Sequence, residues 1–125
     1  MYLMFQKEVA ERIISKHNSK KYGKLSVIAQ TRFSIRKILT APSSIFTPEP
    51  KVDGIVLEFR PKSDYKSVNL KKLQFILTKS FSQRRKKIKT SLKEYVEILK
   101  ANNIDENQRA ENLSIEEYNK ISKFV

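Results

Sequence analysis

The strongest chemical signal in the chain is a run of positive charge. Ile88 and Leu92 are spaced to anchor a helix, so the cations around them should spread over its exposed side. Such a side can bind several successive phosphates of RNA or DNA. A solvated helix face is the alternative, but such faces usually mix both signs of charge, and this run contains no acid. The sequence therefore predicts nucleic-acid binding through a run of six cations, Arg84, Arg85, Lys86, Lys87, Lys89 and Lys93.

A loop stiffened by proline carries the second candidate, Phe46. Pro42, Pro48 and Pro50 each fix their own φ and restrict the residue before them. An aromatic ring held on such a loop is suited to stacking on an unpaired base. From composition alone, a ring folded back into the core is the slightly favoured alternative.

Residues for catalysis are not found. Glycine occurs only at Gly23 and Gly54, so the chain cannot build the Gly-rich turn that dinucleotides and adenosylmethionine usually require. His17 lies among polar loop residues and is interpreted as solvated. Because cysteine is absent, disulfides and Cys-ligated metals are excluded. We expect no catalytic residue, cofactor site or metal site within this chain.

The overall charge supports an anionic partner. Lys and Arg number 26 against 13 Asp and Glu, a formal net charge of +13. Self-repulsion of that size is costly unless a polyanion offsets it, and nucleic acid is the first candidate, a membrane surface the second. The apolar runs are too short to span a membrane, and no secretory signal is visible. We expect a cytoplasmic protein without a membrane partner.

The first half of the chain predicts strands and helices in alternation. Four apolar residues at 2–5 suit a strand buried on both faces of a parallel sheet, which would need neighbours on both edges and hence a segment upstream. A short helix start or an edge strand is the alternative. Helices are expected over residues 7–14 and 22–30, the second with Leu25, Ile28 and Ala29 on one side. Strands are expected over residues 33–39 and 55–59.

The second half predicts helices only. Leucines spaced by three and four follow Asn69, which can cap the helix that they define. A second helix is expected from Ile88 to Leu99, and a third is opened by the capping-box pair Ser114 and Glu117. The predicted fold is an α/β portion over residues 1–62, then a small all-α subdomain over residues 63–125.

Five segments, in order along the chain, resemble a known family. The loop Phe46-Thr47-Pro48-Glu49-Pro50-Lys51-Val52-Asp53 is similar to the Phe-x-Pro-x-Pro-x-Val motif of rRNA adenine-N6 methyltransferases. Residues 4–10, 22–27, 81–86 and 109–114 match further blocks, with the sequences MFQKEVA, YGKLSV, FSQRRK and RAENLS. The chain thus resembles the C-terminal portion of the small-subunit rRNA adenine-N6,N6-dimethyltransferases of the kasugamycin-resistance type.

The resemblance implies both fold and activity. It implies an incomplete Rossmann-like methyltransferase core, with S-adenosylmethionine as cofactor of the complete protein. The expected substrate is a pair of adjacent adenines near the 3′ end of small-subunit rRNA in a pre-ribosomal subunit. Phe46 would pack against the flipped target adenine. Cations within the matched segments, Lys24, Lys51 and Arg109, join the predicted RNA contacts.

The chain also departs from the family pattern. By the resemblance, the Gly-rich donor motif, the acidic ribose-binding residue and the Asn-Leu-Pro-Tyr catalytic motif belong upstream of residue 1. We therefore expect this chain to be inactive alone, with a separate N-terminal half as a candidate partner. Gly54 stands where Ser is usual, and Asn103 where Gly is common. Two alternatives stay open: a non-enzymatic RNA- or ribosome-binding protein, and the antibiotic-resistance branch that methylates large-subunit rRNA. Residues 83–86 and 109–114 favour the small-subunit branch.

Overall fold

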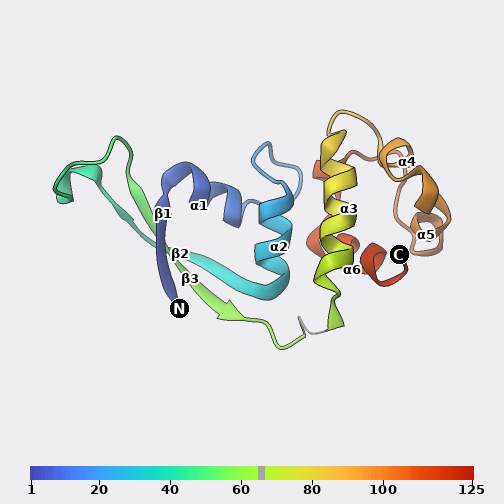
Figure 1. Ribbon diagram of the computed structural model, residues 1–125, viewed down its shortest axis with the longest axis horizontal. Coiled ribbons are helices and arrows are strands. Elements are labelled where there is room, and N and C mark those ends of the chain that lie inside the picture. Colours follow the sequence, from blue (N-terminus) through green and yellow to red (C-terminus); the bar gives the residue numbers. More distant parts are fainter. Residues whose placement is uncertain (65–66) are drawn as a thin grey trace.

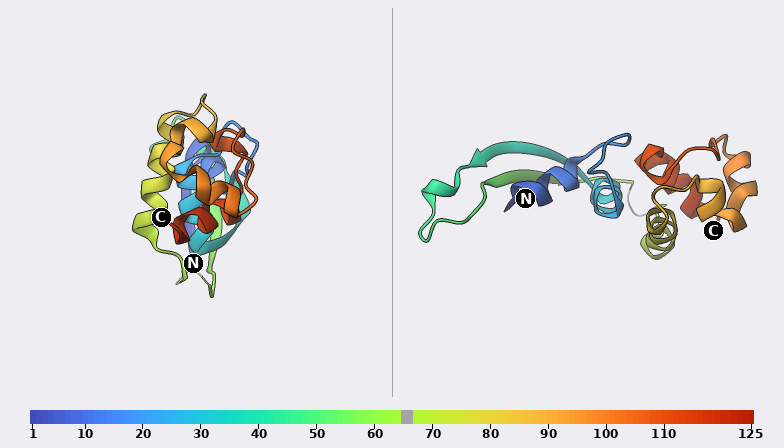
Figure 2. Two further views of the ribbon diagram at one scale, coloured as in Figure 1. Left: turned by 90° about the vertical axis from the view of Figure 1, so that its right-hand side faces the viewer. Right: turned by 90° about the horizontal axis from the view of Figure 1, so that it is seen from above.

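A computed structural model describes residues 1–64 and 67–125. The molecule is elongated, with a small sheet at one end and a group of helices at the other (Figures 1 and 2). The described residues form a three-stranded sheet and six α-helices, which confirms the α/β class. In chain order the elements are β1 Tyr2–Gln6, α1 Lys7–Ile14, α2 Lys24–Arg32, β2 Phe33–Ala41, η1 Ser43–Ile45, β3 Gly54–Pro61, α3 Leu70–Ser82, α4 Ile88–Ser91, η3 Lys93–Tyr95, α5 Val96–Ala101, η4 Ala110–Asn112 and α6 Ile115–Lys123. The predicted boundary between residues 62 and 63 lies just before residues 65–66, which are outside the described residues.

The sheet has the order β1-β3-β2, and both strand pairs are antiparallel. Alternation along β3 places Ile55, Leu57 and Phe59 on one face, where α1 covers them. The ring of Phe59 meets the rings of Phe5 and Phe33 edge-on, with centroids 6.0 and 5.5 Å apart. Both strands expected over residues 33–39 and 55–59 are confirmed.

The first strand is present, but its predicted burial on both faces of a parallel sheet is wrong. It is an edge strand, paired antiparallel with β3, and four of its five residues are exposed. Register puts Tyr2 and Met4 on the same face as Glu58 and Val56. The helices of the described chain leave that face open, so Met4 remains 51% exposed.

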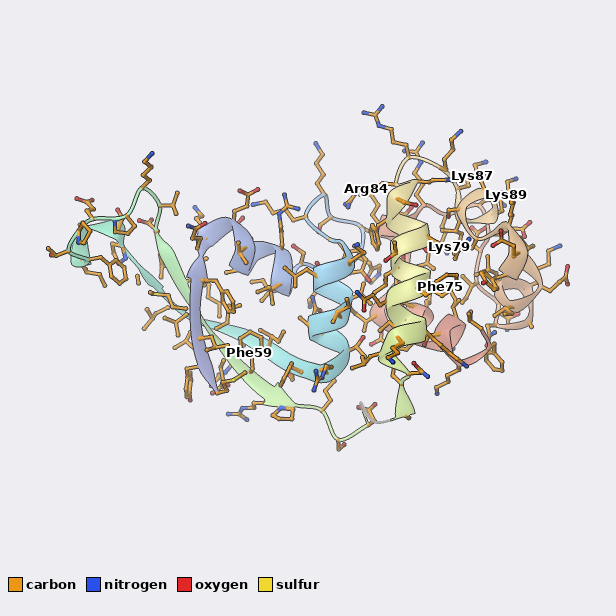
Figure 3. All side chains as sticks on the ribbon, viewed as in Figure 1. Phe59, Phe75, Lys79, Arg84, Lys87 and Lys89 are labelled. Atoms are coloured by element: carbon orange, nitrogen blue, oxygen red, sulfur yellow. The ribbon has the colours of Figure 1, made fainter. Side chains whose placement is uncertain are left out.

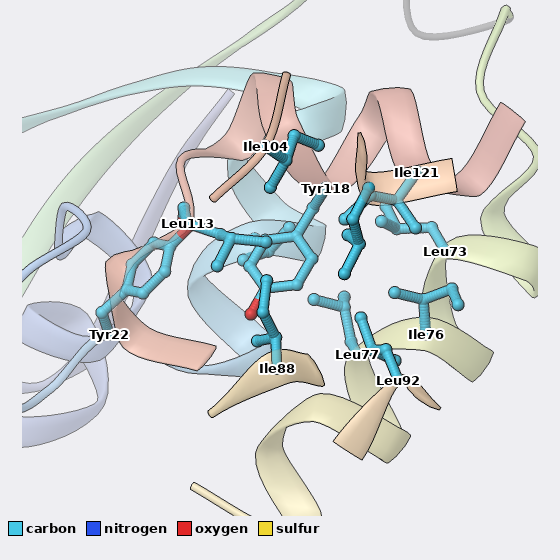
Figure 4. Close-up of a cluster of buried hydrophobic side chains, with 12 residues drawn as sticks. Tyr22, Leu73, Ile76, Leu77, Ile88, Leu92, Ile104, Leu113, Tyr118 and Ile121 are labelled. Carbon is cyan, nitrogen blue, oxygen red and sulfur yellow. The ribbon is translucent and has the colours of Figure 1, made fainter. Parts of the chain in front are cut away.

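A second, larger core joins the helices (Figure 4). It contains Leu73, Leu77 and Tyr118, and it also takes in Tyr22 and Val27 from the first half of the chain. Helix α2 thus lies between the sheet and α3 (Figure 1). Because α2 turns Val27 toward this core, Leu25 is 47% exposed, and its predicted inward position is wrong.

The helix predicted from Ile88 to Leu99 is also wrong as a single element, because it divides into α4, η3 and α5. The backbone N–H groups of Ile88 and Lys89 donate to the carbonyl oxygens of Gln108 and Glu106, at 2.7 and 3.0 Å. Because the chain bonds to this distant segment, it does not continue as one helix. Ile88 and Leu99 are nevertheless buried in the same core.

The two predicted helix caps are confirmed. The side chain of Asn69 accepts from the Lys72 amide at 3.1 Å. Ser114 accepts from the Glu117 amide at 3.1 Å, and the Glu117 carboxylate accepts from the Ser114 amide at 3.0 Å. Each pair satisfies amides that the first helical turn leaves free.

Leu25 of α2 and Leu77 of α3 test which face of each helix is buried. Leu77→Ala should lower the free energy of unfolding by about 2–5 kcal/mol, because Leu77 is fully buried and its removal leaves a cavity. Leu25→Ala is the matched control and should change it by no more than about 0.5 kcal/mol. Denaturant unfolding of both variants measures the difference. Equal losses would contradict the described packing.

Candidate nucleic-acid interface

The predicted cationic run does not lie along one helix face. Residues 84–87 form the turn between α3 and α4, Lys89 lies in α4, and Lys93 begins η3. The turn replaces the expected helix start because the chain pairs with residues 106–109 there. The side chains of Arg85, Lys86 and Lys87 are exposed. Figure 3 shows Arg84, Lys87 and Lys89 gathered at the end of the helical group where α3 stops.

Arg84 differs from its neighbours because its side chain is engaged within the protein. Its Nη2 atom donates to the carbonyl oxygen of Lys20 at 2.8 Å and lies 3.4 Å from Glu111 Oε2. Its guanidinium carbon lies 5.5 Å from the centre of the Phe81 ring, a cation–π distance. The predicted absence of an acidic partner is therefore wrong at Arg84, because Glu111 arrives from a distant part of the chain.

Two further predicted cations lie at the same end. An antiparallel bridge pairs Lys87 with Arg109, so the two backbones lie side by side. Lys24 opens α2 next to Gly23, where a Cβ atom would lie 3.8 Å from Arg84 Nη1. Among the described residues, no ion pair is formed by the exposed side chains of Lys24, Arg85, Lys86, Lys87, Lys89 and Arg109. We call these six side chains the cationic end.

Phe46 and Lys51 lie elsewhere, on the loop between β2 and β3 at the opposite end of the molecule (Figure 1). Phe46 is half-buried and belongs to neither buried core. Its ring lines a cavity of about 250 Å³ with Met4 and Val52. Lys51 is exposed and lines a neighbouring cavity of about 450 Å³ with Lys7. The structure therefore does not bring these two residues to the cationic end.

Asp53 fixes the ends of that loop. Its carboxylate accepts from the Ser43 amide at 3.0 Å, and its carbonyl oxygen accepts from the Lys7 amide at 3.0 Å. The S-adenosylmethionine implied by the resemblance would need a free acid for its ribose and a Gly-rich turn. Asp53 is the only acid lining the Phe46 cavity, and its carboxylate is already bonded. The residues present do not build a donor site by themselves.

A buried carboxylate on the open face of the sheet was not predicted. Glu58 is 4% exposed and accepts from Arg36 Nε at 2.7 Å, Arg60 Nε at 3.1 Å and the Tyr2 hydroxyl at 2.9 Å. The hydrogen bonds from Arg36 and Tyr2 lower the pKa of Glu58 from its ordinary 4.5 to about 2. A carboxylate saturated in this way cannot take up a proton near neutral pH. It ties the three strands together instead of acting as a base.

A model of the family "Ribosomal RNA adenine dimethylase" matches residues 1–125, the whole chain. The chain belongs to this family. Among its relatives, "Ribosomal RNA small subunit methyltransferase A" of Legionella pneumophila (strain Corby) is 38% identical, with 100% of this chain and 50% of the relative covered. The protein of the same name from Francisella tularensis subsp. novicida is 40% identical, with 99% and 49% covered. This chain of the dimethylase family spans about half the length of the curated relatives it matches.

Solved structures show the same fold. A dimethyladenosine transferase from Plasmodium falciparum superposes with a TM-score of 0.82 at 23% identity, covering 96% of this chain and 54% of that one. The 23S rRNA methyltransferase ErmE superposes with a TM-score of 0.64 at 16% identity, covering 98% and 52%. Both similarities support the fold of the dimethylase-family chain, with the better agreement for the dimethyladenosine transferase.

In residues 1–64 and 67–125, no group of three or more His, Cys, Asp or Glu side chains is placed to hold a metal ion. In the same residues, no helix is both long and apolar enough to cross a membrane.

Sequence reasoning missed the contribution of the loop between α1 and α2. Lys16 and Lys20 are exposed there, and Arg84 bonds the backbone of Lys20. The available signal was the density of lysines in residues 16–24, which indicated only a basic loop. Their proximity to residues 84–87 could not be read from spacing, because more than sixty residues separate the two segments.

The pH dependence of stability tests the Glu58 cluster. Because the pKa of Glu58 is lower in the folded chain, its ionised form stabilises the fold fully above pH 4.5, and this contribution is lost as the pH falls toward 2. Glu58→Gln should lower the melting temperature near neutral pH. The difference in melting temperature between this variant and the unchanged chain should shrink as the pH falls from 4.5 toward 2. Glu97→Gln is the control, since Glu97 is exposed and makes no ion pair with the described residues. A Glu58→Gln effect that is constant with pH would rule out the cluster.

Proposed function

We propose that the chain is the C-terminal half of an rRNA adenine-N6,N6-dimethyltransferase of the kasugamycin-resistance type. The complete protein would transfer methyl groups from S-adenosylmethionine to two adjacent adenines near the 3′ end of small-subunit rRNA. Support comes from the family match over the whole chain and from relatives named for small-subunit rRNA. This half would supply rRNA binding and the loop that receives the target adenine.

The observation that carries the proposal is the cationic end. Its six side chains are exposed and have no acidic partner among the described residues, in a chain whose net charge is +13. Unpaired ammonium and guanidinium groups bind phosphates and release the counterions condensed on them. The pairing of residue 87 with residue 109 holds this surface in shape. The proposed RNA surface at this end contains Arg84 to Lys87, Lys89, Lys24 and Arg109, with the Arg84 side chain engaged inside it. Lys51 would contact RNA separately, on the loop that carries Phe46.

The other half of the protein would carry the donor site. The free edge of β1 and the exposed Tyr2 and Met4 suit a sheet that continues into further strands and covering helices, as a Rossmann-like core requires. We therefore propose that this chain has no catalytic residue of its own and is inactive without that half. Its partners would be the pre-ribosomal small subunit and, where the gene is split, a separate N-terminal half, in the cytoplasm.

A non-enzymatic role has one observation in its favour. The chain presents a complete cationic surface, whereas the cavity beside Phe46 lacks the groups for a methyl donor. An RNA- or ribosome-binding protein could use such a surface without chemistry. The large-subunit branch has less support, since ErmE superposes less well than the dimethyladenosine transferase.

Salt dependence of RNA binding tests the proposal. The chain should bind a small-subunit rRNA transcript with an affinity that falls steeply as salt increases. Each phosphate contact contributes about 0.7–0.9 to the slope of log affinity against log salt, so replacing Arg85, Lys86 and Lys87 by Ala should reduce it by about 2–3. Filter binding at several salt concentrations provides the slopes.

The matched control replaces three exposed lysines of α5 and α6, Lys100, Lys120 and Lys123, by Ala. The net charge is then the same in both triple variants. If the control reduces the slope as much as the first variant does, binding is unspecific and the proposed surface is wrong.

Phe46 is tested in a complete enzyme that carries this segment. Chemistry on a stacked base requires its extrusion, and stacking on Phe46 should contribute about 1–3 kcal/mol. Phe46→Ala should then slow methyl transfer roughly 5- to 150-fold, while ribosome affinity, supplied by the distant cationic end, changes little. Turnover, ribosome binding and melting temperature are measured together.

Phe46→Tyr and Phe46→Trp are the controls, because both keep a flat ring and should keep most of the activity. A core role predicts instead that Trp is as harmful as Ala and that Ala lowers the melting temperature by several degrees. Normal turnover of a destabilised Phe46→Ala enzyme would reject the stacking role.

A further inference from the structure

The loop between α1 and α2, residues 15–23, brings a second group of lysines to the cationic end. We call it the 15–23 loop. Lys16 and Lys20 are exposed and form no ion pair with the described residues, whereas Lys21 is paired with Glu11 of α1. In Figure 1 the loop rises beside the end of α3, next to the turn that carries Arg85. Two segments that are far apart in sequence thus present free cations side by side.

The loop is fastened at several points to the helical group. The Asn18 amide donates to the Glu111 carbonyl oxygen at 2.7 Å, and the Asn112 side-chain amide donates to Asn18 Oδ1 at 2.9 Å. Asn18 adopts a φ of 71°, a left-handed conformation that Asn tolerates better than most residues. The buried Tyr22 hydroxyl donates to the Leu113 carbonyl oxygen at 2.7 Å. The loop therefore has a defined position relative to residues 109–113.

Within residues 1–64 and 67–125, the only hydrogen bond from the cationic run to this loop is made by Arg84, which donates to the carbonyl oxygen of Lys20. Its charge is offset by Glu111, and its ring contact with Phe81 holds the guanidinium in place. The planar guanidinium can bond Lys20 and face Glu111 with the same group, which a lysine ammonium does with less directional control. A side chain engaged in this way is better suited to positioning a loop than to binding a phosphate.

We infer that the 15–23 loop is a second phosphate-binding segment, contacting RNA through Lys16 and Lys20, and that Arg84 is the positioning residue that holds it beside Arg85, Lys86 and Lys87. This inference rests on the proposed RNA binding and extends it. Lysine ammonium groups bind phosphate oxygens as point charges, so the contact requires position more than orientation. The RNA surface then has two parts, and Arg84 joins the cationic run directly to the loop.

The first experiment compares two double variants of the full chain with a small-subunit rRNA transcript as probe. Lys16→Gln with Lys20→Gln should reduce the salt slope by about 1.4–1.8, the value for two lost phosphate contacts. Lys120→Gln with Lys123→Gln has the same net charge and should leave the slope unchanged. Equal slopes for the two variants would overturn the inference and leave the proposed function intact. A salt-independent affinity of the unchanged chain would instead defeat the proposed function.

The second experiment separates positioning from charge. Arg84→Lys keeps the charge, so a direct phosphate contact predicts normal binding. If Arg84 positions the loop, Arg84→Lys should weaken RNA binding and speed hydrogen exchange at the Asn18 amide. That amide is protected by its hydrogen bond to Glu111, which requires the loop to stay in place. Arg12→Lys, at an exposed side chain of α1 outside the cationic end, should change neither.

Combining the variants completes the test. If Arg84 acts through the loop, Arg84→Lys should weaken RNA binding much less when Lys16 and Lys20 are already Gln. Full additivity of the two losses would overturn the positioning role. A loop variant that loses binding to phosphatidylserine vesicles but keeps its RNA salt slope would overturn the assignment to RNA.

Discussion

Two buried tyrosines and the half-buried Phe81 hold the cationic end of this chain in place. The rings of Tyr22 and Tyr118 pack against Phe81, with centroids 6.2 and 5.9 Å away. Their hydroxyls donate to the carbonyl oxygens of Leu113 and Ala110 at 2.7 and 2.6 Å. Burial raises the pKa of both hydroxyls, so they remain protonated donors at any physiological pH. Since Tyr22 ends the 15–23 loop and Phe81 precedes Arg84 by one turn, this cluster fixes where the cations of both segments lie.

The distribution of acids explains why one end of the molecule stays positive. Several acids form ion pairs with particular cations. Glu58 pairs with Arg36 and Arg60, and Glu111 pairs with Arg84. These pairs join strands or join loops to helices, so each contributes to shape. The partly exposed pair between Arg84 and Glu111 adds little stability, and its larger effect is on the electrostatic field around it. Six exposed cations without an acidic partner among the described residues lie where α3 ends, so a polyanion would be attracted there.

Local signals in the sequence predicted much of the fold. Alternation at Ile55, Leu57 and Phe59 and the caps at Asn69 and Ser114 depend on neighbours within a few residues, so the sequence could show them. Features decided by distant residues could not be predicted. The break after Ile88 depends on Gln108, and the partner of Arg84 is Glu111. The sequence identified most cations of the candidate site, but their arrangement in space depends on tertiary contacts. The family blocks carried the remaining information, since five short motifs in order are specific even where each alone is weak.

The separation of Phe46 from the cationic end has a physical consequence. The sheet and α2 lie between them, so no single side chain can serve both (Figure 1). Phosphate contacts set position on an RNA without reading its sequence, whereas a ring on a loop meets one base. Most of the affinity can then be held at the cationic end, independent of the base presented at the other. In the proposed complete enzyme, a loop that adds little binding of its own would release its base after reaction, while the protein remains on the RNA. Such an arrangement suits successive modification of neighbouring bases, since the phosphate contacts need not be broken between one base and the next.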